Sequence, residues 1–452
     1  MNSPLSRLCA PATVAALAVT ACLLAPAAHA NGRPPSSSSI RFRTGHPNDL
    51  VVGLTWGLLI SHNGGQTFEW FCESAVGYGG AFDPDYEYLE NGTVLATTFN
   101  GLLANSNGCT FDATPLSSSE ATPPNERKFI SVIAQGPDGA LYAADSGSVS
   151  AGKIYKSTDN GTTWPLATVA GNNADWWSSI EVAPSDKNRV YLFGYRLESG
   201  QPRKFLALRS TDGGVSFQAL PVTGFATSEQ ASIDVAAISA TNADDLWARV
   251  DTPVAGMAGT DYYHSTDGGM TWSKKLSIGD YSQAFVLRSN GEIYVGAAQS
   301  TNYKSINGGE TFTELTPSLR TRCAVEAPDK SLWVCAQDQA PDMMSIGKST
   351  DLAAWTKVYR FEETTKPVTC RSGQLQYDEC QLQTWCMVKQ QLGILSTVVD
   401  CSPQPLVDAN TPIVNPPDDK GCCDAGTPGS SSMVSALGVA WVLLRRRRQA
   451  RT

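Results

Sequence analysis

Short apolar runs alternate with turn-forming residues along most of the chain, a pattern typical of β-strands. Residues 178–183 alternate apolar and polar side chains, and residues 190–195 form the continuous apolar run of a buried strand. With residues 205–209 and 218–222 they predict four consecutive strands, and residues 40–72 divide in the same way. Pro137-Asp138-Gly139 and Asn290-Gly291 are typical turn signals elsewhere, and no long amphipathic helix is predicted. The pattern therefore predicts an all-β fold.

One short motif, Ser-x-Asp-x-Gly-x-Thr-aromatic, recurs between the third and fourth strand of each set. Three clear copies contain Asp159, Asp212 and Asp267, and two further copies carry Asn63 and Asn307 at the same position. Residues 104–111 form a degenerate copy, and residues 349–355, which contain Asp351, form a shortened one. The Asp or Asn side chain can accept hydrogen bonds from backbone N–H groups and so fold a turn. Since the copies occur once per set, on separate turns, we interpret these residues as structural rather than as metal ligands or catalytic acids.

The spacing of the motif predicts the architecture. Its closing aromatic residues are separated by 43, 53, 53, 55, 40 and 43 residues, and each interval suits one four-stranded blade. The aromatic residues are Phe68, Phe111, Trp164, Phe217, Trp272, Phe312 and Trp355. We therefore predict a seven-bladed β-propeller over residues 38–361, because a closed ring leaves few exposed strand edges. Each of these aromatic residues should begin an outer strand.

The repeated motif resembles that of the Asp-box (BNR-repeat) superfamily, which includes sialidases, the sortilin receptor domain, photosystem assembly factors and some glucan hydrolases. The resemblance covers residues 38–361 and implies a propeller. It does not imply one activity, because the same turns occur in enzymes and in binding proteins.

Both ends of the chain have the features of export signals. Residues 1–30 have Arg7, an apolar run and the cleavage site Ala28-His29-Ala30, as in a signal peptide, and residues 31–37 form a short linker. Residues 402–421 have the composition of an extended, Pro-rich stalk. Residues 422–452 contain paired cysteines, a short apolar segment and an arginine cluster, and they resemble the myxobacterial C-terminal sorting tag. That resemblance implies cleavage and retention at the cell surface; a permanent transmembrane anchor is the alternative.

Eight cysteines remain in the body of the chain, and an even number in an exported protein indicates disulfides. We predict that Cys323 pairs with Cys335 across a turn and that Cys72 pairs with Cys109. The other four should pair within a small, disulfide-stapled C-terminal cap at residues 362–401. They are Cys370, Cys380, Cys386 and Cys401. No Cys-x-x-Cys pair or neighbouring histidine indicates a zinc site.

The charge of the body limits its partners. Without the signal and the tail, 28 basic and 42 acidic residues remain, for a net charge of −14. This charge argues against nucleic acid and against anionic membrane surfaces, so we expect membrane contact only through the tail. We expect a monomer without cofactor or metal, because no phosphate-binding glycine loop or histidine-rich cluster is present.

The loops that lead into the inner strands usually build the binding face of a propeller. In this sequence they contain aromatic, acidic and basic residues, which suit a glycan or a protein ligand. These candidates are Tyr78, Arg127, Lys128, Trp176, Trp177, Glu229, Asp280, Tyr281, Arg320 and Arg322. Ordinary solvated loop residues are the alternative for each. Trp176 and Trp177 are the strongest candidates, because adjacent residues of a strand point to opposite sides.

Two classes of function remain open. The first is a non-catalytic, surface-retained propeller that binds a glycan, a peptide or an envelope partner. The second is a glycoside hydrolase of sialidase type, although the Arg-Ile-Pro motif of that family is absent. A carboxylate pair at one mouth of the channel would favour the enzyme, and a mouth lined with aromatic side chains would favour the binding protein.

Overall fold

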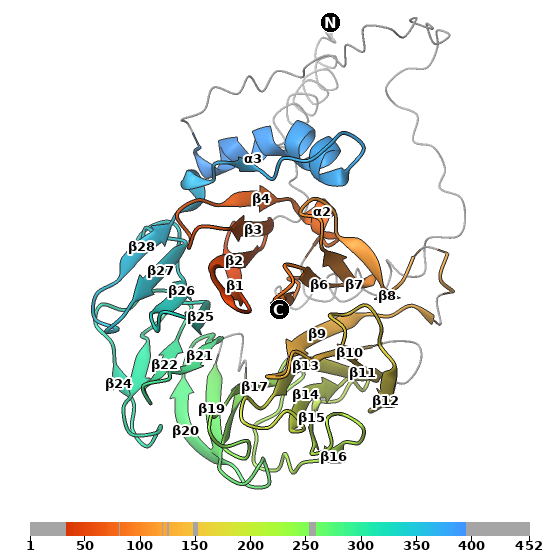
Figure 1. Cartoon of the computed structure of the whole chain (residues 1–452). Helices are drawn as coiled ribbons and strands as arrows, with labels where there is room; N and C mark the ends of the chain where they lie inside the picture. Colours follow the sequence, from red (N-terminus) through yellow and green to blue (C-terminus); the bar gives the residue numbers. More distant parts are fainter. Residues whose placement is uncertain are drawn as a thin grey trace, which may run out of the picture. The chain divides into compact units, whose positions relative to one another are not determined.

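The computed structural model describes residues 33–394 except 81, 120, 124–125, 148–151 and 253–258. The predicted signal peptide, the stalk and the C-terminal tail lie outside the described residues. Seven antiparallel sheets follow one another around a central channel (Figure 1). The prediction of a seven-bladed β-propeller is therefore confirmed.

Each blade consists of four consecutive strands, ordered from the channel to the outer edge. Blades 1 to 3 are formed by β1 (Ser37–Arg43), β2 (His46–Leu54), β3 (Gly57–Ser61) and β4 (Glu69–Phe71); β5 (Tyr86–Tyr88), β6 (Val94–Thr98), β7 (Gly101–Asn105) and β8 (Asp112–Ser117); and β9 (Ile130–Gln135), β10 (Leu141–Asp145), β11 (Lys153–Ser157) and β12 (Leu166–Val169). Blades 4 and 5 are formed by β13 (Asp175–Val182), β14 (Val190–Arg196), β15 (Lys204–Ser210) and β16 (Gln218–Ala219); and β17 (Ser232–Ile238), β18 (Leu246–Asp251), β19 (Thr260–Ser265) and β20 (Ser273–Ile278). Blades 6 and 7 are formed by β21 (Ala284–Leu287), β22 (Ile293–Gly296), β23 (Tyr303–Ser305) and β24 (Thr313–Glu314); and β25 (Cys323–Glu326), β26 (Leu332–Cys335), β27 (Ile346–Ser349) and β28 (Thr356–Tyr359).

The repeated motif forms the turn before each outer strand. In blade 4, the Ser210 hydroxyl donates to Asp212 Oδ1 (2.8 Å) and accepts from the Gly214 N–H (2.9 Å). Asp212 accepts from the backbone N–H (2.9 Å) and the hydroxyl (2.5 Å) of Ser216. These hydrogen bonds, the one from the Ser216 hydroxyl first, lower the pKa of Asp212 to about 2. Both carboxylate oxygens of Asp212 are thus used inside its own turn.

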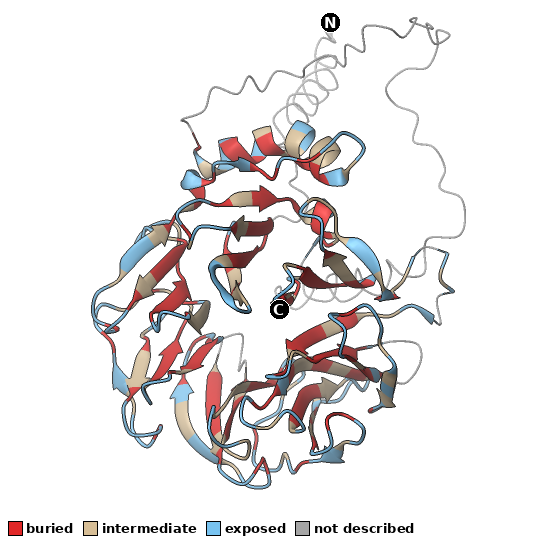
Figure 2. Cartoon of the chain, in the orientation of Figure 1, coloured by how far each residue is buried: buried red, intermediate tan, exposed pale blue. Residues whose placement is uncertain are grey.

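Aromatic side chains pack the blades against one another, and buried residues follow the strands in every blade (Figure 2). In blade 6, the ring of Phe312 stands edge-on to Trp247 of blade 5, with 6.2 Å between the centroids. Gly309 of the same turn has φ +82°, and a Cβ there would lie 2.2 Å from Cη2 of Trp247. The motif glycine therefore serves both the turn and the blade interface. The seven closing aromatic residues lie one or two residues before β4, β8, β12, β16, β20, β24 and β28, as predicted.

The ring closes without exchange of strands between the two ends of the chain, because β1 to β4 come entirely from the N-terminal part. After blade 7 the chain instead passes back over the outer edge of blade 1. There β29 (Lys366–Pro367) pairs with β4 in parallel, so that the first sheet has five strands. We call residues 361–394 the clasp; besides β29 it contains η2 (Phe361–Glu363), the π-helix η3 (Gln376–Thr384) and α3 (Trp385–Leu392). A further short helix, α2 (Glu73–Val76), follows β4.

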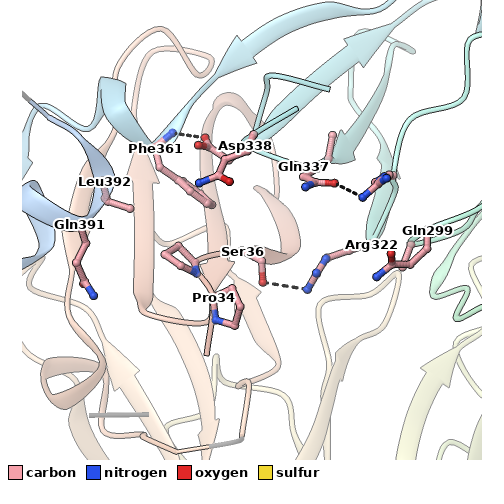
Figure 3. Close-up of a pocket in the computed structure, with 14 residues that line it drawn as sticks. Pro34, Ser36, Gln299, Arg322, Gln337, Asp338, Phe361, Gln391 and Leu392 are labelled. Atoms are coloured by element: carbon pink, nitrogen blue, oxygen red, sulfur yellow. Dashed lines mark hydrogen bonds between the residues drawn. The ribbon is translucent and has the colours of Figure 1, made fainter. Parts of the chain in front are cut away.

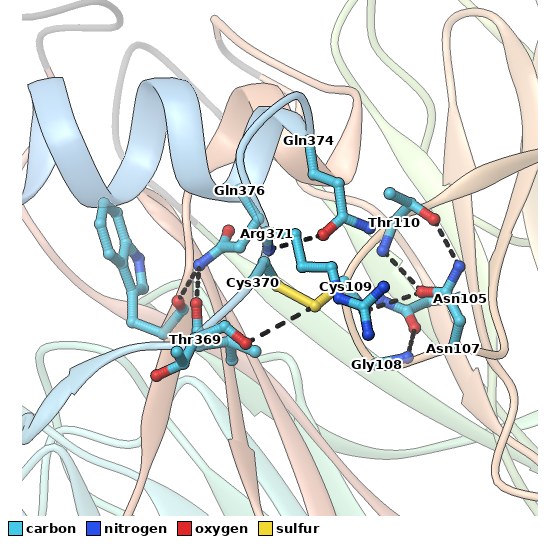
Figure 4. The surroundings of a disulfide bond; sticks show 12 residues. Asn105, Asn107, Gly108, Cys109, Thr110, Thr369, Cys370, Arg371, Gln374 and Gln376 are labelled. Atoms are coloured by element: carbon cyan, nitrogen blue, oxygen red, sulfur yellow. Dashed lines mark hydrogen bonds between the residues drawn. A yellow bond between two sulfur atoms is a disulfide. The ribbon is translucent and has the colours of Figure 1, made fainter. Parts of the chain in front are cut away.

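Two disulfides fasten the clasp to the first two blades. Cys72 is bonded to Cys380, with 5.4 Å between the Cα atoms, and Cys109 is bonded to Cys370 at 5.7 Å (Figure 4). The predicted Cys72–Cys109 pair is therefore wrong, and so is the prediction that Cys370 and Cys380 pair within a cap. The pairing differs because the clasp returns to blade 1 and brings its own cysteines beside both partners.

The predictions for the other body cysteines have different outcomes. Cys323 and Cys335 are bonded across the β25–β26 pair, as predicted, and they are direct register partners there. Cys386 is also disulfide-bonded. Cys401 lies outside the described residues.

Candidate functional site

The two mouths of the channel are built from different kinds of connection. Because neighbouring strands in each blade are antiparallel, the connections between blades and those between the second and third strands lie at one mouth. We call this mouth the loop face. The repeated turns lie toward the other side, which we call the turn face. All the predicted ligand-binding residues lie on connections to inner strands or at the start of such a strand, on the loop face.

Trp176 and Trp177 lie at the start of β13, the inner strand of blade 4, and point in opposite directions. Trp177 is only 3% exposed and packs in the core between blades 3 and 4. Trp176 is half-buried and lies over Gly147, where a Cβ would come within 2.4 Å of the indole ring. Of the two, Trp176 is therefore the one available to a ligand.

Trp176 contacts a cluster of three phenylalanine side chains on the loop face, and we call these four residues the aromatic row. The centroid distances are 5.7 Å from Trp176 to Phe129, 5.0 Å from Phe129 to Phe99, 4.8 Å from Phe99 to Phe82, and 5.5 Å from Phe82 to Phe129. Phe99 is 56% exposed, and the other three rings are partly exposed. Phe82, Phe99 and Phe129 lie on connections in blades 1 to 3 and Trp176 lies on β13, so the row forms where successive blades pack side by side. Next to it, Arg33 forms an ion pair with Asp83 at 2.9 Å.

Arg320 and Arg322 line a polar cavity of about 250 Å³ between blades 6, 7 and 1 (Figure 3). Arg320 Nη1 donates to Gln337 Oε1 (2.9 Å), and Arg322 Nη1 donates to Ser36 Oγ (3.1 Å). Gln299, at the edge of the same cavity, comes from the β22–β23 connection. We call this the arginine pocket.

The other predicted residues have mixed roles. Asp280 is buried, and its Oδ2 accepts from the N–H groups of Gln299 (2.6 Å) and Ser300 (2.8 Å), so it shapes a loop beside the arginine pocket. Tyr281 is 42% exposed on the loop face.

Tyr78 is buried, and its hydroxyl donates to Leu54 O (2.6 Å), which is a structural contact. Glu229 and Arg127 are exposed on separate connections. Arg127 Nε donates to Thr122 O (3.2 Å), and Lys128 is half-buried beside it. The structure thus does not bring all the predicted residues into one cluster.

The channel itself contains charged groups that sequence analysis did not single out. Arg41 on β1 forms an ion pair with Asp85 (3.2 Å), and Glu87 on β5 and Glu181 on β13 interact with both. Enclosure by the inner strands raises the pKa of Glu87 to about 8 and that of Glu181 to about 7, while Arg41 opposes both shifts. Glu181 is solvent-exposed within this ring, and it lies five residues along β13 from Trp176, or about 17 Å.

Metal-binding clusters and membrane-spanning helices are both absent from the described residues. Among them, no group of His, Cys, Asp or Glu side chains is arranged to hold a metal ion. None of the helices in this part of the chain is long and apolar enough to cross a membrane. The predicted tail anchor lies outside it.

Sequence analysis missed Phe82, Phe99 and Phe129, three of the four aromatic-row residues. Phe99 and Phe129 are each the one aromatic residue of their connection, Phe82 shares its connection with Tyr78, and the connections differ in length and sequence. Phe129 directly follows the predicted Lys128, so a search for aromatic residues next to inner strands could have found it.

Comparison with known protein families supports the repeat. Residues 263–274, which include the Asp267 turn, match the BNR/Asp-box repeat family. No curated protein matches the sequence.

Several solved structures are similar. YCF48 from Cyanidioschyzon merolae is 14% identical over 67% of this chain and 93% of its own, with a TM-score of 0.43. A structure of YCF48 bound to D1 peptide is 17% identical over 51% of this chain and 67% of its own (TM-score 0.36). The Hadza microbial sialidase Hz136 is 12% identical over 58% of this chain and 65% of its own (TM-score 0.37).

None of these similarities identifies a ligand. Together with the seven sheets and the turns described above, the repeat match leads to one structural conclusion. The chain is a seven-bladed β-propeller, and one of its repeated turns, in residues 263–274, is similar to the BNR/Asp-box repeat.

Proposed function

We propose that this protein is an exported, surface-retained, non-catalytic propeller that binds an extracellular glycan or protein ligand on its loop face. The observation that carries the proposal is the aromatic row of Phe82, Phe99, Phe129 and Trp176. Clustered aromatic side chains at a solvent-facing site usually serve recognition, because they offer a large contact area at a small entropic cost.

The arrangement of the rings in the aromatic row favours a peptide ligand over a glycan. Phe99 and Phe129 are stacked, with 17° between their planes and 5.0 Å between their centroids, so each covers part of the other's face. A sugar would need an open ring face, whereas an apolar side chain can pack against ring edges. Phenylalanine also lacks a polar group that could hydrogen-bond to sugar hydroxyls.

Export is supported by the disulfides. Bonds such as Cys72–Cys380 and Cys323–Cys335 form and persist in oxidising compartments and are rare in the cytosol. Retention at the surface rests on the resemblance of residues 422–452 to a sorting tag. Immunolabelling of intact cells, with and without these residues, tests both parts of the proposal.

The ligand class can be tested with the purified protein on peptide and glycan arrays, followed by affinity measurements. Phe99→Ala and Trp176→Ala should each weaken binding about tenfold or more, because they remove exposed contact area without disturbing the core. Ile306→Ala is the matched control, since Ile306 is 76% exposed on a turn of the opposite side. Binding that both aromatic variants retain in full would refute the aromatic row as the site.

A glycoside hydrolase is the second candidate, favoured by the raised pKa values of Glu87 and Glu181. A carboxyl group that stays protonated near neutral pH can act as a general acid. We rank this candidate second because Glu181 lies far along β13 from the aromatic row. Fluorogenic glycosides should show no turnover; hydrolysis that is lost in Glu87→Gln or Glu181→Gln would reverse the ranking.

A further inference from the structure

The clasp creates a second cavity that adjoins the arginine pocket. This cavity has a volume of about 480 Å³ and lies between blade 1 and the η3–α3 helices. We call it the clasp cavity. Pro35, Gln391 and Leu392 line both cavities, so the C-terminal end of α3 stands at the boundary between them. A ligand that passed this boundary would occupy both.

The two cavities differ in chemistry. The arginine pocket presents two guanidinium groups, the side-chain amides of Gln299 and Gln337, and the Ser36 hydroxyl. The clasp cavity presents the apolar surfaces of Trp56, Trp70, Tyr78, Met387, Val388 and Leu392. Met387 is 47% exposed even though it adjoins this apolar surface.

The positive charge of the arginine pocket is not balanced by ion pairs. In the described part of the chain, no carboxylate lies within ion-pair distance of either Arg320 or Arg322, and their side chains bond to an amide and a hydroxyl instead. Asp338 also lines the pocket, but it accepts from the Phe361 N–H (2.8 Å) and lies 3.7 Å from Arg360. Asp342 Oδ2 accepts from the backbone N–H of Arg320 (2.9 Å), so it fixes the loop rather than the guanidinium.

The charged side chains also determine which end of a ligand would enter which cavity. Arg33, Glu73 and Glu379 line the clasp cavity, and the charge of Arg33 is balanced by its ion pair with Asp83 at 2.9 Å, so the two carboxylates would repel a negatively charged group there. The same group would be attracted to Arg320 and Arg322, whose planar forks match carboxylate and phosphate oxygens. An oriented ligand therefore has its anionic end in the arginine pocket and its apolar part in the clasp cavity.

We propose that the two cavities bind one amphipathic anion, an unbranched alkyl chain that ends in a carboxylate or a phosphate. Arg320 and Arg322 hold the anionic group, Leu392 contacts the chain at the boundary, and Trp56, Met387 and Val388 enclose its far end. Each methylene that enters the clasp cavity should strengthen binding about fourfold. This site is separate from the aromatic row and does not depend on the function proposed for it.

The test is titration of the full-length protein with alkyl probes below their micellar concentrations. Dodecanoate and dodecyl phosphate should bind, octanoate should bind more weakly, and dodecanol, acetate and inorganic phosphate should bind at least tenfold more weakly than dodecanoate. The carboxylate and phosphate probes distinguish a fatty acid from a lipid phosphate as the natural source of the anion.

Variants locate each end of the ligand. Arg320→Gln and Arg322→Gln should each weaken dodecanoate binding about tenfold and leave dodecanol unchanged. Leu392→Trp should reduce the affinity for dodecanoate to that of a short anion, because the larger side chain fills the boundary. Arg371→Gln is the charge-matched control, since Arg371 is exposed on the clasp outside both cavities. Phe99→Ala should have no effect.

Two results would overturn the proposal. One is equal affinity for dodecanoate and dodecanol that neither arginine variant changes, since the anionic group would then lie elsewhere. The other is undiminished dodecanoate binding by Leu392→Trp with an unchanged melting temperature, since the chain would then not cross the boundary.

Discussion

The disulfides at the two ends of the ring differ in what they hold together. Cys323–Cys335 closes a loop of 12 residues between two strands that already pair, whereas Cys72–Cys380 and Cys109–Cys370 span 308 and 261 residues. The first adds to a hairpin that hydrogen bonds already maintain. The other two hold the clasp in place after the chain has crossed from β28 of the last blade to β29 at the outer edge of the first. Covalent bonds are thus most important where the repeat itself provides no link.

The clasp disulfides should therefore have the largest effect on stability. Removal of Cys72–Cys380 by serine substitution should cost about 4 kcal/mol on the chain-entropy estimate, because Cys109–Cys370 still shortens the loop, and loss of the second bond as well should cost about 6 kcal/mol more. Denaturant unfolding measures the loss, and hydrogen exchange should accelerate first in β1 to β4 and β25 to β28. Uniform acceleration in all blades would contradict a special role for this junction.

The hairpin disulfide should have a smaller effect. Cys323→Ser with Cys335→Ser should cost about 3 kcal/mol, since a short loop loses less entropy on closure. Exchange should accelerate only in β25 and β26. If this pair proved more important than the clasp bonds, loop length would not be what distinguishes the two regions.

Loss of one hydrogen bond in a repeated turn should destabilise the protein less than loss of a disulfide. Ser210 is 1% exposed, and Ser210→Ala would leave the buried Gly214 N–H without its acceptor, at a cost of about 1–2 kcal/mol. Thermal melting measures the change. Ligand binding at the loop face should remain as in the wild type, and its loss in a folded variant would show that the turn face takes part in recognition.

The smallest expected effect is on stability in acid, where turns that contain Asp should differ from turns that contain Asn. The folded-state pKa values of Asp159, Asp212 and Asp267 are lowered to about 2, so their stabilising effect is present above the unfolded pKa, near 4, and is lost as pH falls toward 2. Replacing all three with Asn, the residue found at positions 63 and 307, should flatten the stability profile between pH 4 and 2. An unchanged profile would mean that other carboxylates control acid unfolding.

Sequence reasoning could predict the blades because each blade carries its own local signals. The Asp212 turn, for example, is specified by residues 210–217, and the hydrogen bonds of Asp212 itself all lie within that segment. The Cys323–Cys335 bond followed from strand register in the same way. The aromatic row could not be predicted, since Phe82 and Trp176 are far apart in sequence and no periodicity relates them.

The sequence by itself thus determined the number of blades, the turns and the one local disulfide, because these depend on residues within a single blade. Only the tertiary structure decided the partners of Cys72 and Cys109, the grouping of the aromatic row and the two cavities beside α3. The aromatic row depends on the packing of successive blades, and the disulfides and cavities depend on the return of the clasp to blade 1. Both bring together residues separated by up to about 300 positions, and local propensity carries no information about such contacts.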